Sequence, residues 1–575
     1  MASDGRTRPA GHSPFPGLRS FQDSPWRAFC GREAEAHALS RLWRSKRVTI
    51  LHGEAGAGKT SLVRAGVVHL LRGHHADVLP VGDLTERSAF AAAPLLEHNP
   101  LTLALAACWA PLEAPARLSG MTLADVLRQR APSRPGSVTY AAVDHAEELF
   151  SAPAQPRRYR EEFIGQIAAA LRERAGLHLL VIIRDSRLGA FLADSRDHEQ
   201  LRPGAWFRLP GLSPAAAAEA VRRPAQLAGA PAAPGTAEMI VDAVLASPAD
   251  YSAGRLDDPE AVRVYPPYLQ CVTSRWWAAR RGHGQQPPDD RPAGEGQVTD
   301  ADSWLSDLIV RAVYAVSRYY ELDPARLCRW LARVAGGAAG GRVTVTDRLG
   351  LVASVQVMVL RAFEDHYVLR AGQRAGRPWT QLQSQRMSGP LRLAGHRITG
   401  LAAAARPATF ADRLADAVRA FARGDYDLAD RHAWRALRVS AEAGRGAEAR
   451  AQTLLGNIAY QRGHPQRARD HYVTAAKLFE ATTSRRAVGH LLAAIGRLHL
   501  TEDDTAAAAV SLQSAVSRLP FDGSVKVDLA RAFAASGAQR AAVAVLEGVL
   551  ADNEPEAGRA LSLRSAILAD LGEAR

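Results

Sequence analysis

Residues 47–71, RVTILHGEAGAGKTSLVRAGVVHLL, decide the fold of the N-terminal part of the chain. Val48 to Leu51 is a β-branched apolar run, which predicts a buried strand. The residues from Gly53 to Thr60 match the pattern G-x-x-x-x-G-K-[ST], and Ser61 to Leu71 has the pattern of a helix. Strand, glycine loop and helix follow one another in the order that a phosphate-binding loop requires.

The residue types of this loop suit a nucleoside phosphate with magnesium. Glycines let backbone N–H groups turn toward a β-phosphate, and the N-terminus of the helix adds a partial positive charge. Lys59 is predicted to reach the β- and γ-phosphates, and the Thr60 hydroxyl to ligate Mg²⁺. We therefore expect ATP or ADP with Mg²⁺ as cofactors, bound by Gly53, Gly56, Gly58, Lys59, Thr60 and Ser61.

A second strand brings acidic residues. In SVTYAAVDHAEELF, residues 137–150, an apolar run ends at Asp144, which is predicted to hold the magnesium ion through water. Glu147 and Glu148 follow within a turn, and either is placed to orient an attacking water. The alternatives are a helix cap for Asp144 and a solvated helix face for each glutamate.

A third strand, LHLLVIIRD at residues 177–185, ends at Arg184. An arginine at the carboxyl edge of a parallel sheet faces the ligand crevice. Arg184 is therefore predicted either to sense a γ-phosphate or to form an ion pair with a neighbouring acid. Apolar strands alternate with helical stretches to about Leu209, which predicts an α/β fold with a parallel sheet.

Composition excludes several classes of protein. The chain has 575 residues, too many for one core, and 47% are apolar, so global disorder is excluded. No apolar run approaches the roughly 18 residues of a membrane span, and the N-terminus has no secretory h-region, so we expect a cytoplasmic protein without a membrane segment. The four cysteines lie far apart and predict no disulfide framework.

The net charge of +13 does not by itself indicate nucleic acid. Only four of the 72 basic residues are lysines and no dense basic run occurs, so nucleic-acid binding is not favoured. Residues 407–575 carry 22 Lys and Arg against 20 Asp and Glu, which leaves +11 on residues 1–406. The C-terminal part is thus not a basic cradle, and we expect it to bind a protein or peptide.

Pattern changes divide the chain into five parts. The region after residue 298 has a helical stretch (Trp304 to Val334), a short strand candidate (342–347), a helix and a hairpin candidate (366–383), an order that suggests a winged helix. The expected parts are a disordered tail (1–13), a P-loop NTPase domain (14–209), a helical domain (210–296) with an exposed linker (284–297), a winged-helix-like domain (298–406) and helical repeats (407–575).

The last part is repetitive. Each repeat has a glycine slot, occupied by Gly424, Gly463, Asp503 and Gly537, with Gly572 near the C-terminus. Small residues recur five and twelve positions after each slot, which lets two antiparallel helices pack closely. The spacings of 39, 40, 34 and 35 residues resemble tetratricopeptide repeats, two of them longer than usual. The alternative is a generic alanine-rich helical bundle.

Together these motifs resemble the bacterial novel STAND group of P-loop NTPases. The resemblance covers roughly residues 15–395. It rests on FPGLRSFQDSPWRAFCGREAE (15–35), the phosphate-binding loop, VDHAEELF (143–150), LVIIRDSRLGAFL (180–192), FRLPGLSPAAAAEAVRRPAQLAG (207–229), YPPYLQCVTSRWW (265–277) and WTQLQSQRMSGPLR (379–392).

The resemblance implies further roles. It places Gly31 and Arg32 against the adenine, Pro267 at a nucleotide-contacting position and Arg184 in the sensor position. The sequence departs from the group at three positions. Ser186 stands where an acid is common, His145 follows the Walker B aspartate, and Ser384 stands where many relatives have a histidine that reads ADP.

The function that the resemblance implies is an ATP-driven signalling switch. ADP holds the modules closed, a ligand on the repeats favours the open state, ATP exchange permits oligomerisation, and slow hydrolysis resets the switch. Because only 14 residues precede Phe15, the effector is expected to be a separate protein. Two alternatives stay open, namely a transcription regulator whose winged helix reads DNA and a nucleotide-stapled scaffold without hydrolysis.

Overall fold

The computed structural model describes the chain with gaps. The described residues are 13–21, 29–73, 76–85, 99–111, 118, 121–129, 138–150, 157–245, 262–282, 301–336, 343–344, 353–374, 377–401, 409–482, 484–551 and 557–571. The expected linker 284–297, Gly572 and all but the last residue of the expected tail lie outside these ranges. Within them, no helix combines the length and the apolar character that crossing a bilayer demands.

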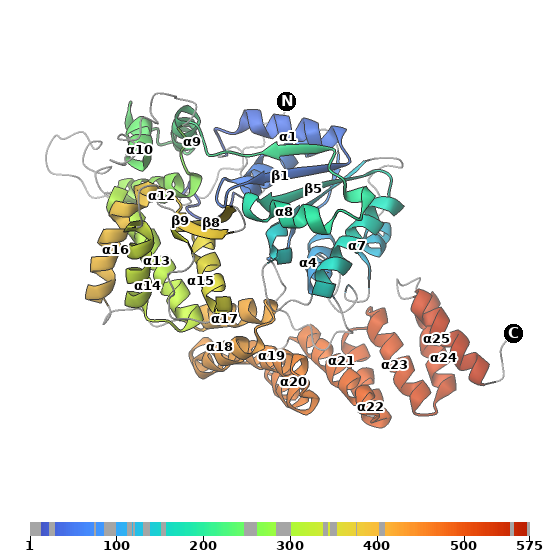
Figure 1. Ribbon diagram of the computed structural model, residues 1–575. Coiled ribbons are helices and arrows are strands. Elements are labelled where there is room, and N and C mark those ends of the chain that lie inside the picture. Colours follow the sequence, from blue (N-terminus) through green and yellow to red (C-terminus); the bar gives the residue numbers. More distant parts are fainter. Residues whose placement is uncertain are drawn as a thin grey trace.

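A parallel β-sheet forms the centre of the N-terminal part (Figure 1). Its strands run in the order β2–β4–β5–β1–β6, β3 also pairs with β4, and every pairing is parallel. The glycine loop follows β1, so β5 separates it from β4. The strands are β1 (Val48–Gly53), β2 (Asp77–Val78), β3 (Gly82–Asp83), β4 (Thr139–Asp144), β5 (Leu177–Arg184) and β6 (Ala205–Arg208).

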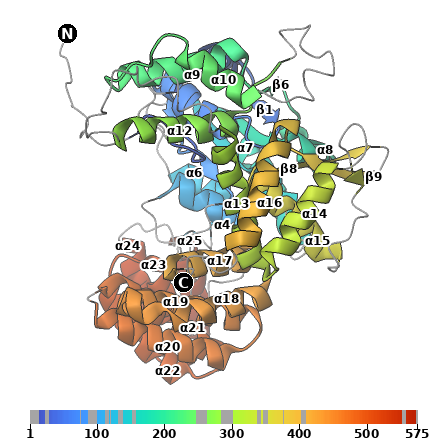
Figure 2. The ribbon, with the colours of Figure 1, turned by 90° about the vertical axis from the view of Figure 1, so that its left-hand side faces the viewer.

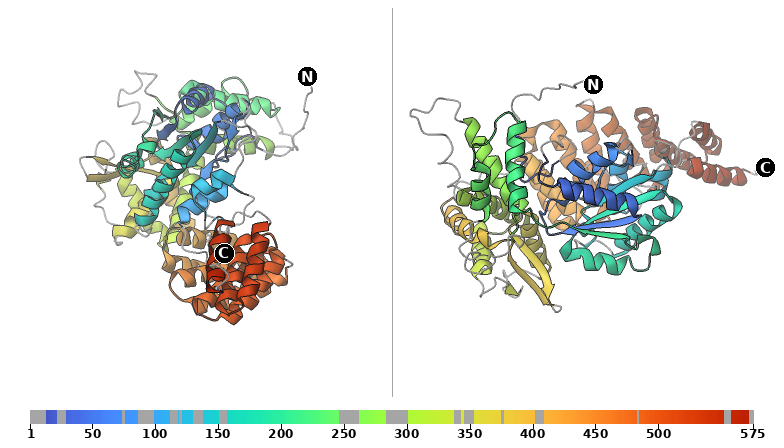
Figure 3. Two further views of the ribbon diagram at one scale, coloured as in Figure 1. Left: turned by 90° about the vertical axis from the view of Figure 1, so that its right-hand side faces the viewer. Right: turned by 90° about the horizontal axis from the view of Figure 1, so that it is seen from above.

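The strands β1, β4 and β5 are buried on both faces, which explains why they appear in the sequence as continuous apolar runs. Leu179 and Val181 of β5 belong to one hydrophobic core, and Leu180 and Ile182 belong to the other. Figure 3 shows helices on both sides of the sheet. The helices that pack into the first core are α4 (Pro100–Trp109), α6 (Leu123–Gln129), α7 (Arg157–Glu173) and α8 (Asp185–Asp194). Those that pack into the second core are α1 (Glu33–Ser45), η2 (Leu62–Val67) and α3 (Val68–Gly73). The short helix α2 (Lys59–Ser61) leads directly into η2 and α3.

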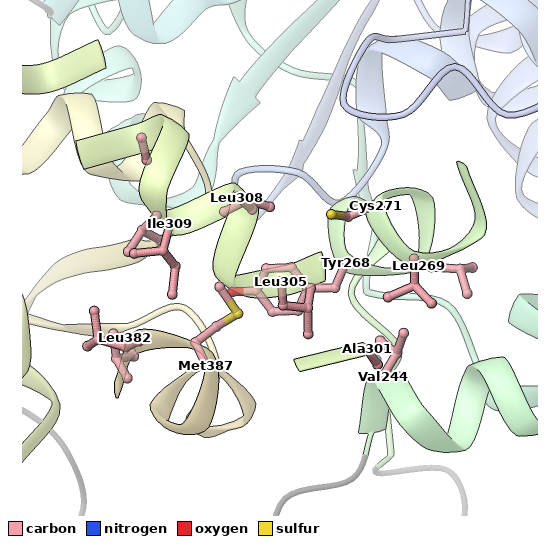
Figure 4. Packing of buried hydrophobic residues seen from close by; sticks show 14 of the residues in the cluster. Val244, Tyr268, Leu269, Cys271, Ala301, Leu305, Leu308, Ile309, Leu382 and Met387 are labelled. Atoms are coloured by element: carbon pink, nitrogen blue, oxygen red, sulfur yellow. The ribbon is translucent and has the colours of Figure 1, made fainter. Parts of the chain in front are cut away.

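A helical body follows the sheet and has one continuous hydrophobic core. Val244, Leu269, Leu305 and Met387 meet in it although they come from four different elements (Figure 4). The elements of the helical body therefore pack as one unit. The helical body consists of α9 (Pro214–Leu227), α10 (Thr236–Leu245), α12 (Pro266–Gly282), α13 (Ala301–Tyr320), α14 (Pro324–Gly336), α15 (Ala353–Asp365) and α16 (Ser388–Leu401), with a three-stranded sheet of β7 (Val343–Thr344), β8 (Leu369–Arg374) and β9 (Arg377–Leu382).

The expected hairpin is present and the expected helical stretch is divided. Of the strand candidate 342–347, only Val343 and Thr344 lie within the described residues, as β7. β8 and β9 form the antiparallel hairpin expected over 366–383, and β7 pairs with β9. The helical stretch expected from Trp304 to Val334 divides into α13 and α14. Glu321 has a left-handed φ of +58°, and Asp323 caps the new helix by accepting from the amide of Arg326 at 3.0 Å.

The C-terminal helices stack in antiparallel pairs as an α-solenoid of tetratricopeptide-like repeats (Figure 1). The four slot residues each follow the first helix of a pair, and all have left-handed φ angles from +59° to +84°. The small residues at offsets five and twelve are fully buried, which confirms the repeat spacing; they are Ala429, Ala436, Ala468, Ala475, Ala508, Ala515, Ala542 and Val549. The helices are α17 (Phe410–Ala422), α18 (Tyr426–Arg438), α19 (Arg445–Gln461), α20 (Pro465–Glu480), α21 (Arg485–Thr501), α22 (Thr505–Arg518), α23 (Gly523–Ala535), α24 (Gln539–Ala551) and α25 (Ala557–Asp570).

The first repeat is anchored on the end of α13. Arg318 Nε donates to Asp416 Oδ2 of α17 at 2.7 Å, and His432 Nε2 of α18 lies 2.9 Å from the carbonyl oxygen of Tyr319. Figure 2 shows α17 and α18 against the lower end of the helical body. The repeat array is thus fixed to the helical body through buried polar contacts as well as through packing.

Two glycines of the repeats allow a test of whether paired helices pack in close contact. A Cβ on Gly456 of α19 would lie 2.5 Å from Cε1 of the fully buried Tyr472, whereas a Cβ on Gly548 of α24 would have no neighbour within 4 Å. Gly456→Ala is expected to lower the free energy of unfolding by about 1–3 kcal/mol through overpacking. Gly548→Ala is expected to raise it by up to about 1 kcal/mol through helix propensity. Urea unfolding followed by helical circular dichroism measures both, and equal effects would contradict the close helix contact at Gly456.

Candidate functional site

The carboxyl ends of β1, β4 and β5 lie side by side at one edge of the sheet. Gly53 of β1 pairs in register with Arg184 of β5, and Asp144 ends β4 on the other side of β5. A cavity of about 360 Å³ opens at this edge. The sequence-predicted residues that line it are Arg32, Gly56, Gly58, Lys59, Thr60, Ser61, Asp144, Glu147, Arg184 and Pro267.

The loop after β1 requires glycine at two positions for different reasons. Gly56 and Gly58 have φ angles of +75° and +93°, which side chains rarely adopt. A Cβ on Gly56 would also lie 2.6 Å from Cγ of Pro267, so this glycine lets α12 approach the loop. A Cβ on Gly58 would meet no atom within 4 Å, so this glycine keeps the backbone open toward the cavity.

Lys59 is held in the centre of the loop. Its ammonium donates to the carbonyl oxygens of Gly53 at 2.9 Å and Glu54 at 2.8 Å. Burial lowers the pKa of Lys59, and the nearby carboxylates of Glu147 and Asp144 oppose that effect. The loop carbonyls thus position the single lysine that lines the cavity.

Asp144 and Thr60 fit a magnesium ion. Asp144 is 1% exposed, and its Oδ2 has no hydrogen-bond partner among the described residues. Burial raises the pKa of Asp144, and the charge of His145 and, less, the Thr60 hydroxyl in part lower it. Mg²⁺ usually takes one or two protein ligands and completes its shell with water and phosphate oxygens. An unsatisfied carboxylate oxygen near a threonine hydroxyl matches that requirement.

Glu147, His145 and Arg184 form a charged cluster on the cavity wall. Arg184 Nε donates to Glu147 Oε1 at 2.7 Å, and His145 Nδ1 lies 3.6 Å from the same oxygen. Burial lowers the pKa of His145, but Asp144 and Glu147 raise it to about 10. Burial raises the pKa of Glu147, but Arg184 and His145 bring it well below its usual range. Glu147 is therefore an ionised carboxylate between two cations.

The helical body reaches into this edge of the sheet. Glu148 is absent from the cavity lining, and its Oε1 accepts from Arg361 Nη2 of α15 at 2.9 Å. Glu54 of the glycine loop accepts from Gln383 Nε2 at 3.1 Å and lies 3.3 Å from Arg370 Nη1 of β8. Two acidic residues of the sheet's loops are thus engaged by α15 and the hairpin.

The two residues expected at the adenine, Gly31 and Arg32, and the first glycine of the loop, Gly53, separate into two groups. Arg32 lines the cavity, and its Nη2 donates to the carbonyl oxygen of Pro210 at 2.6 Å. Gly31 and Gly53 do not line it. A Cβ on Gly31 would lie 2.3 Å from the carbonyl oxygen of Ala216, and one on Gly53 would lie 2.5 Å from that of Leu209. These two glycines permit close packing of the backbone.

Some lining residues were not predicted from the sequence. Asp83 ends β3, pairs in register with Asp144, and lies 3.3 Å from Arg64 Nη2 of η2. β3 has only two residues, so it produces no periodic signal. Phe21 and Tyr367 also line the cavity. The amide of Phe21 donates to Ser61 Oγ at 3.1 Å, which fixes the N-terminal leader against the phosphate-binding loop.

Comparison with known proteins supports the class that the residues indicated. Residues 14–285 match the family described as Novel STAND NTPase 1. The matched segment contains the glycine loop, Asp144, Arg184 and Pro267. No curated protein matches the chain.

Several solved structures align with large parts of this chain at low identity. A Walker-type ATPase of Pyrococcus abyssi shares 15% identity over 63% of this chain and 95% of its own, with a TM-score of 0.39. The ORC2 protein of Aeropyrum pernix, in ADPNP and ADP complexes, shares 14% over 65% of this chain and 95% of its own, with a TM-score of 0.38. A STAND protein with a tetratricopeptide repeat sensor from Pyrococcus horikoshii shares 13% over 98% of this chain and 76% of its own, with a TM-score of 0.27.

Two buried aspartates test the interpretation of Asp144. Asp144→Asn is expected to raise the free energy of unfolding of the nucleotide-free protein at neutral pH by about 1 kcal/mol, because burial disfavours its ionised form. Asp528→Asn is the matched control. Arg497 Nε donates to Asp528 at 2.5 Å, so this change is expected to lower the free energy by about 1–3 kcal/mol. Urea unfolding without Mg²⁺ measures both, and a destabilised Asp144→Asn variant would show that the charge of His145 outweighs the burial of Asp144, contrary to this expectation.

Proposed function

We propose that the protein is an ATP-binding signalling switch of the STAND class. ADP/ATP exchange and slow hydrolysis are coupled to a ligand on the repeats and to a separate effector. The observation that carries the proposal is the gathering of Lys59, Thr60, Asp144 and Arg184 around one cavity. An ammonium, a hydroxyl, a carboxylate with an unsatisfied oxygen and a guanidinium are the groups that bind and stabilise a transferring phosphoryl group.

Each residue has a role in this proposal. Lys59 binds the β- and γ-phosphates, and Thr60 and Asp144 hold Mg²⁺, which neutralises phosphate charge when bound. Arg184 contacts the γ-phosphate, and Glu147 or Glu148 orients the attacking water. Both glutamates are paired with arginines in this arrangement, Glu147 with Arg184 and Glu148 with Arg361. Paired carboxylates are weak bases, which supports slow turnover.

The repeats and the helical body supply the rest of the switch. The proposal divides the chain at 14–209, 210–296, 298–406 and 407–575, and the order α14, β7, α15, β8, β9 supports a winged helix in the third part. The repeat array binds a protein or peptide, and ATP permits a homo-oligomer in the cytoplasm of a bacterium. Such proteins serve signalling in conflict or regulatory systems.

A DNA-binding regulator is the second candidate, favoured by the +11 charge on residues 1–406. Arg370 of the hairpin pairs with Glu54 of the glycine loop at 3.3 Å, so at least this basic residue serves an internal contact. A salt-dependent shift of duplex DNA would support the second candidate. A scaffold without hydrolysis would bind nucleotide with no turnover.

The first experiment compares Lys59→Ala with wild type and with Lys477→Ala, an exposed lysine on α20. Purified wild type is expected to carry ADP and to hydrolyse ATP slowly. Lys59→Ala is expected to lose carried nucleotide and at least about 100-fold of the ATPase rate, because the buried ammonium faces the phosphates. Lys477→Ala should match wild type. Nucleotide released on denaturation is measured by chromatography, and absence of both nucleotide and turnover in wild type would refute the switch.

A further inference from the structure

The guanidinium of Arg184 joins the sheet to the helical body. Its Nε donates to Glu147 Oε1 at 2.7 Å, and its Nη2 lies 2.8 Å from Asp365 Oδ1. Asp365 is the last residue of α15, which lies between the sheet and the first repeat (Figure 1). Arg184 also lines the cavity at the phosphate-binding loop. One cation therefore serves two carboxylates from different parts of the chain and also borders the proposed γ-phosphate position.

Asp365 is ionised and surrounded by positive charge. Burial raises the pKa of Asp365, but Arg184, Arg361 and Arg423 lower it below its usual value. Arg423 follows α17 of the first repeat, and its Nη2 lies 3.9 Å from Asp365 Oδ2. The Arg423 side chain also lies over the ring of Tyr319, with Cζ 5.6 Å from the centroid. The carboxylate of Asp365 thus touches both the candidate nucleotide site and the repeat array.

A γ-phosphate beside Arg184 would bring a third anion to a guanidinium that already holds Glu147 and Asp365. Like charges at close range in a buried site repel strongly, so one of the three anions must leave. Glu147 lies in the short 3-10 helix η3 (Ala146–Phe150) directly after β4, so the sheet that carries Arg184 also holds Glu147 in place. Asp365 belongs to the helical body, which has its own continuous core through Phe363 and can move as a unit. ADP has no γ-phosphate and leaves the Arg184–Asp365 pair intact.

We propose that Asp365 competes with the γ-phosphate of ATP for Arg184, and that Arg423 of the first repeat keeps Asp365 paired when Arg184 is released. This inference rests on the proposed nucleotide switch and names the residue that discriminates ATP from ADP. In the arrangement seen here, the competition weakens ATP binding and leaves ADP binding unaffected. When Arg184 is released, Arg423 takes its place as the partner of Asp365, so the half-buried carboxylate stays paired and the nucleotide site is linked to the repeats.

The test measures affinities of the full chain for ADP and for a non-hydrolysable ATP analogue, both with Mg²⁺. Asp365→Asn is expected to raise the affinity for the analogue relative to ADP by about tenfold or more. Glu321→Gln is the matched control. Glu321 lies at the same junction and pairs with Arg435 at 2.6 Å, and no contact joins it to Arg184 among the described residues. In Glu321→Gln, the ratio of the affinity for the analogue to the affinity for ADP should stay within about threefold of the wild-type ratio.

Arg184→Gln completes a double-mutant cycle. In the Arg184→Gln background, Asp365→Asn should change the ratio by less than about threefold, because the contested cation is absent. An unchanged ratio in Asp365→Asn, or an equal change with and without Arg184, would overturn the inference while the proposed switch stands. Wild-type protein that binds neither nucleotide would overturn the proposed function and this inference with it.

A measurement on wild type covers the case in which Asp365→Asn does not fold. The amides of His366 and Val368 donate to the carbonyls of Ala362 and Phe363 at the end of α15. The ATP analogue is expected to speed hydrogen exchange in residues 361–368 by about tenfold relative to ADP, because release from Arg184 loosens this end. Equal exchange with the two nucleotides would overturn the inference.

Discussion

The burial of Arg184 between two carboxylates is the constraint on which the arrangement of the parts depends. A charged side chain that leaves water costs several kcal/mol unless ionised partners and hydrogen bonds compensate it. Arg184 is 16% exposed and obtains one partner, Glu147, from the turn of helix after β4 and another, Asp365, from α15. The sheet and the helical body therefore cannot separate at this point unless another anion replaces Asp365. The nucleotide site is built where such an anion would be bound.

The contacts around the Arg184–Asp365 pair all join the carboxyl edge of the sheet to α15 or the hairpin. Glu54 follows β1, Glu148 follows β4 and Arg184 ends β5, so all three stand at the carboxyl edge of the sheet. Their partners on α15 and the hairpin are Arg370, Arg361 and Asp365. In each of the three pairs the two side chains carry opposite charge, and the residue at the sheet edge is the acid in two of them. The interface between sheet and helical body is an electrostatic match whose strength changes when phosphate charge enters the cavity.

The sequence predicted those features that local rules determine. The glycine loop, the strands before Asp144 and Arg184 and the repeat slots each depend on residues close together in the chain. Asp503 shows this well, since its slot position predicted a helix end and its φ is +59°. The pairing of Asp365 with Arg184 could not be predicted, because the two residues lie 181 positions apart and each charge has many candidate partners. The strands β2 and β3 were missed because two residues show no alternation.

The same physical reasoning bears on how such a chain distinguishes two nucleotides. Ser384 stands where a histidine would be expected to read ADP, and its hydroxyl accepts from the amide of Arg386 at 3.2 Å without lining the cavity. A hydrogen bond to ADP from this position would favour the closed state by adding an attraction. Asp365 favours the same state by opposing an additional charge. Because a repulsion at close range is large where little water screens it, one carboxylate on α15 discriminates the two nucleotides in the proposed switch although Ser384 does not line the cavity.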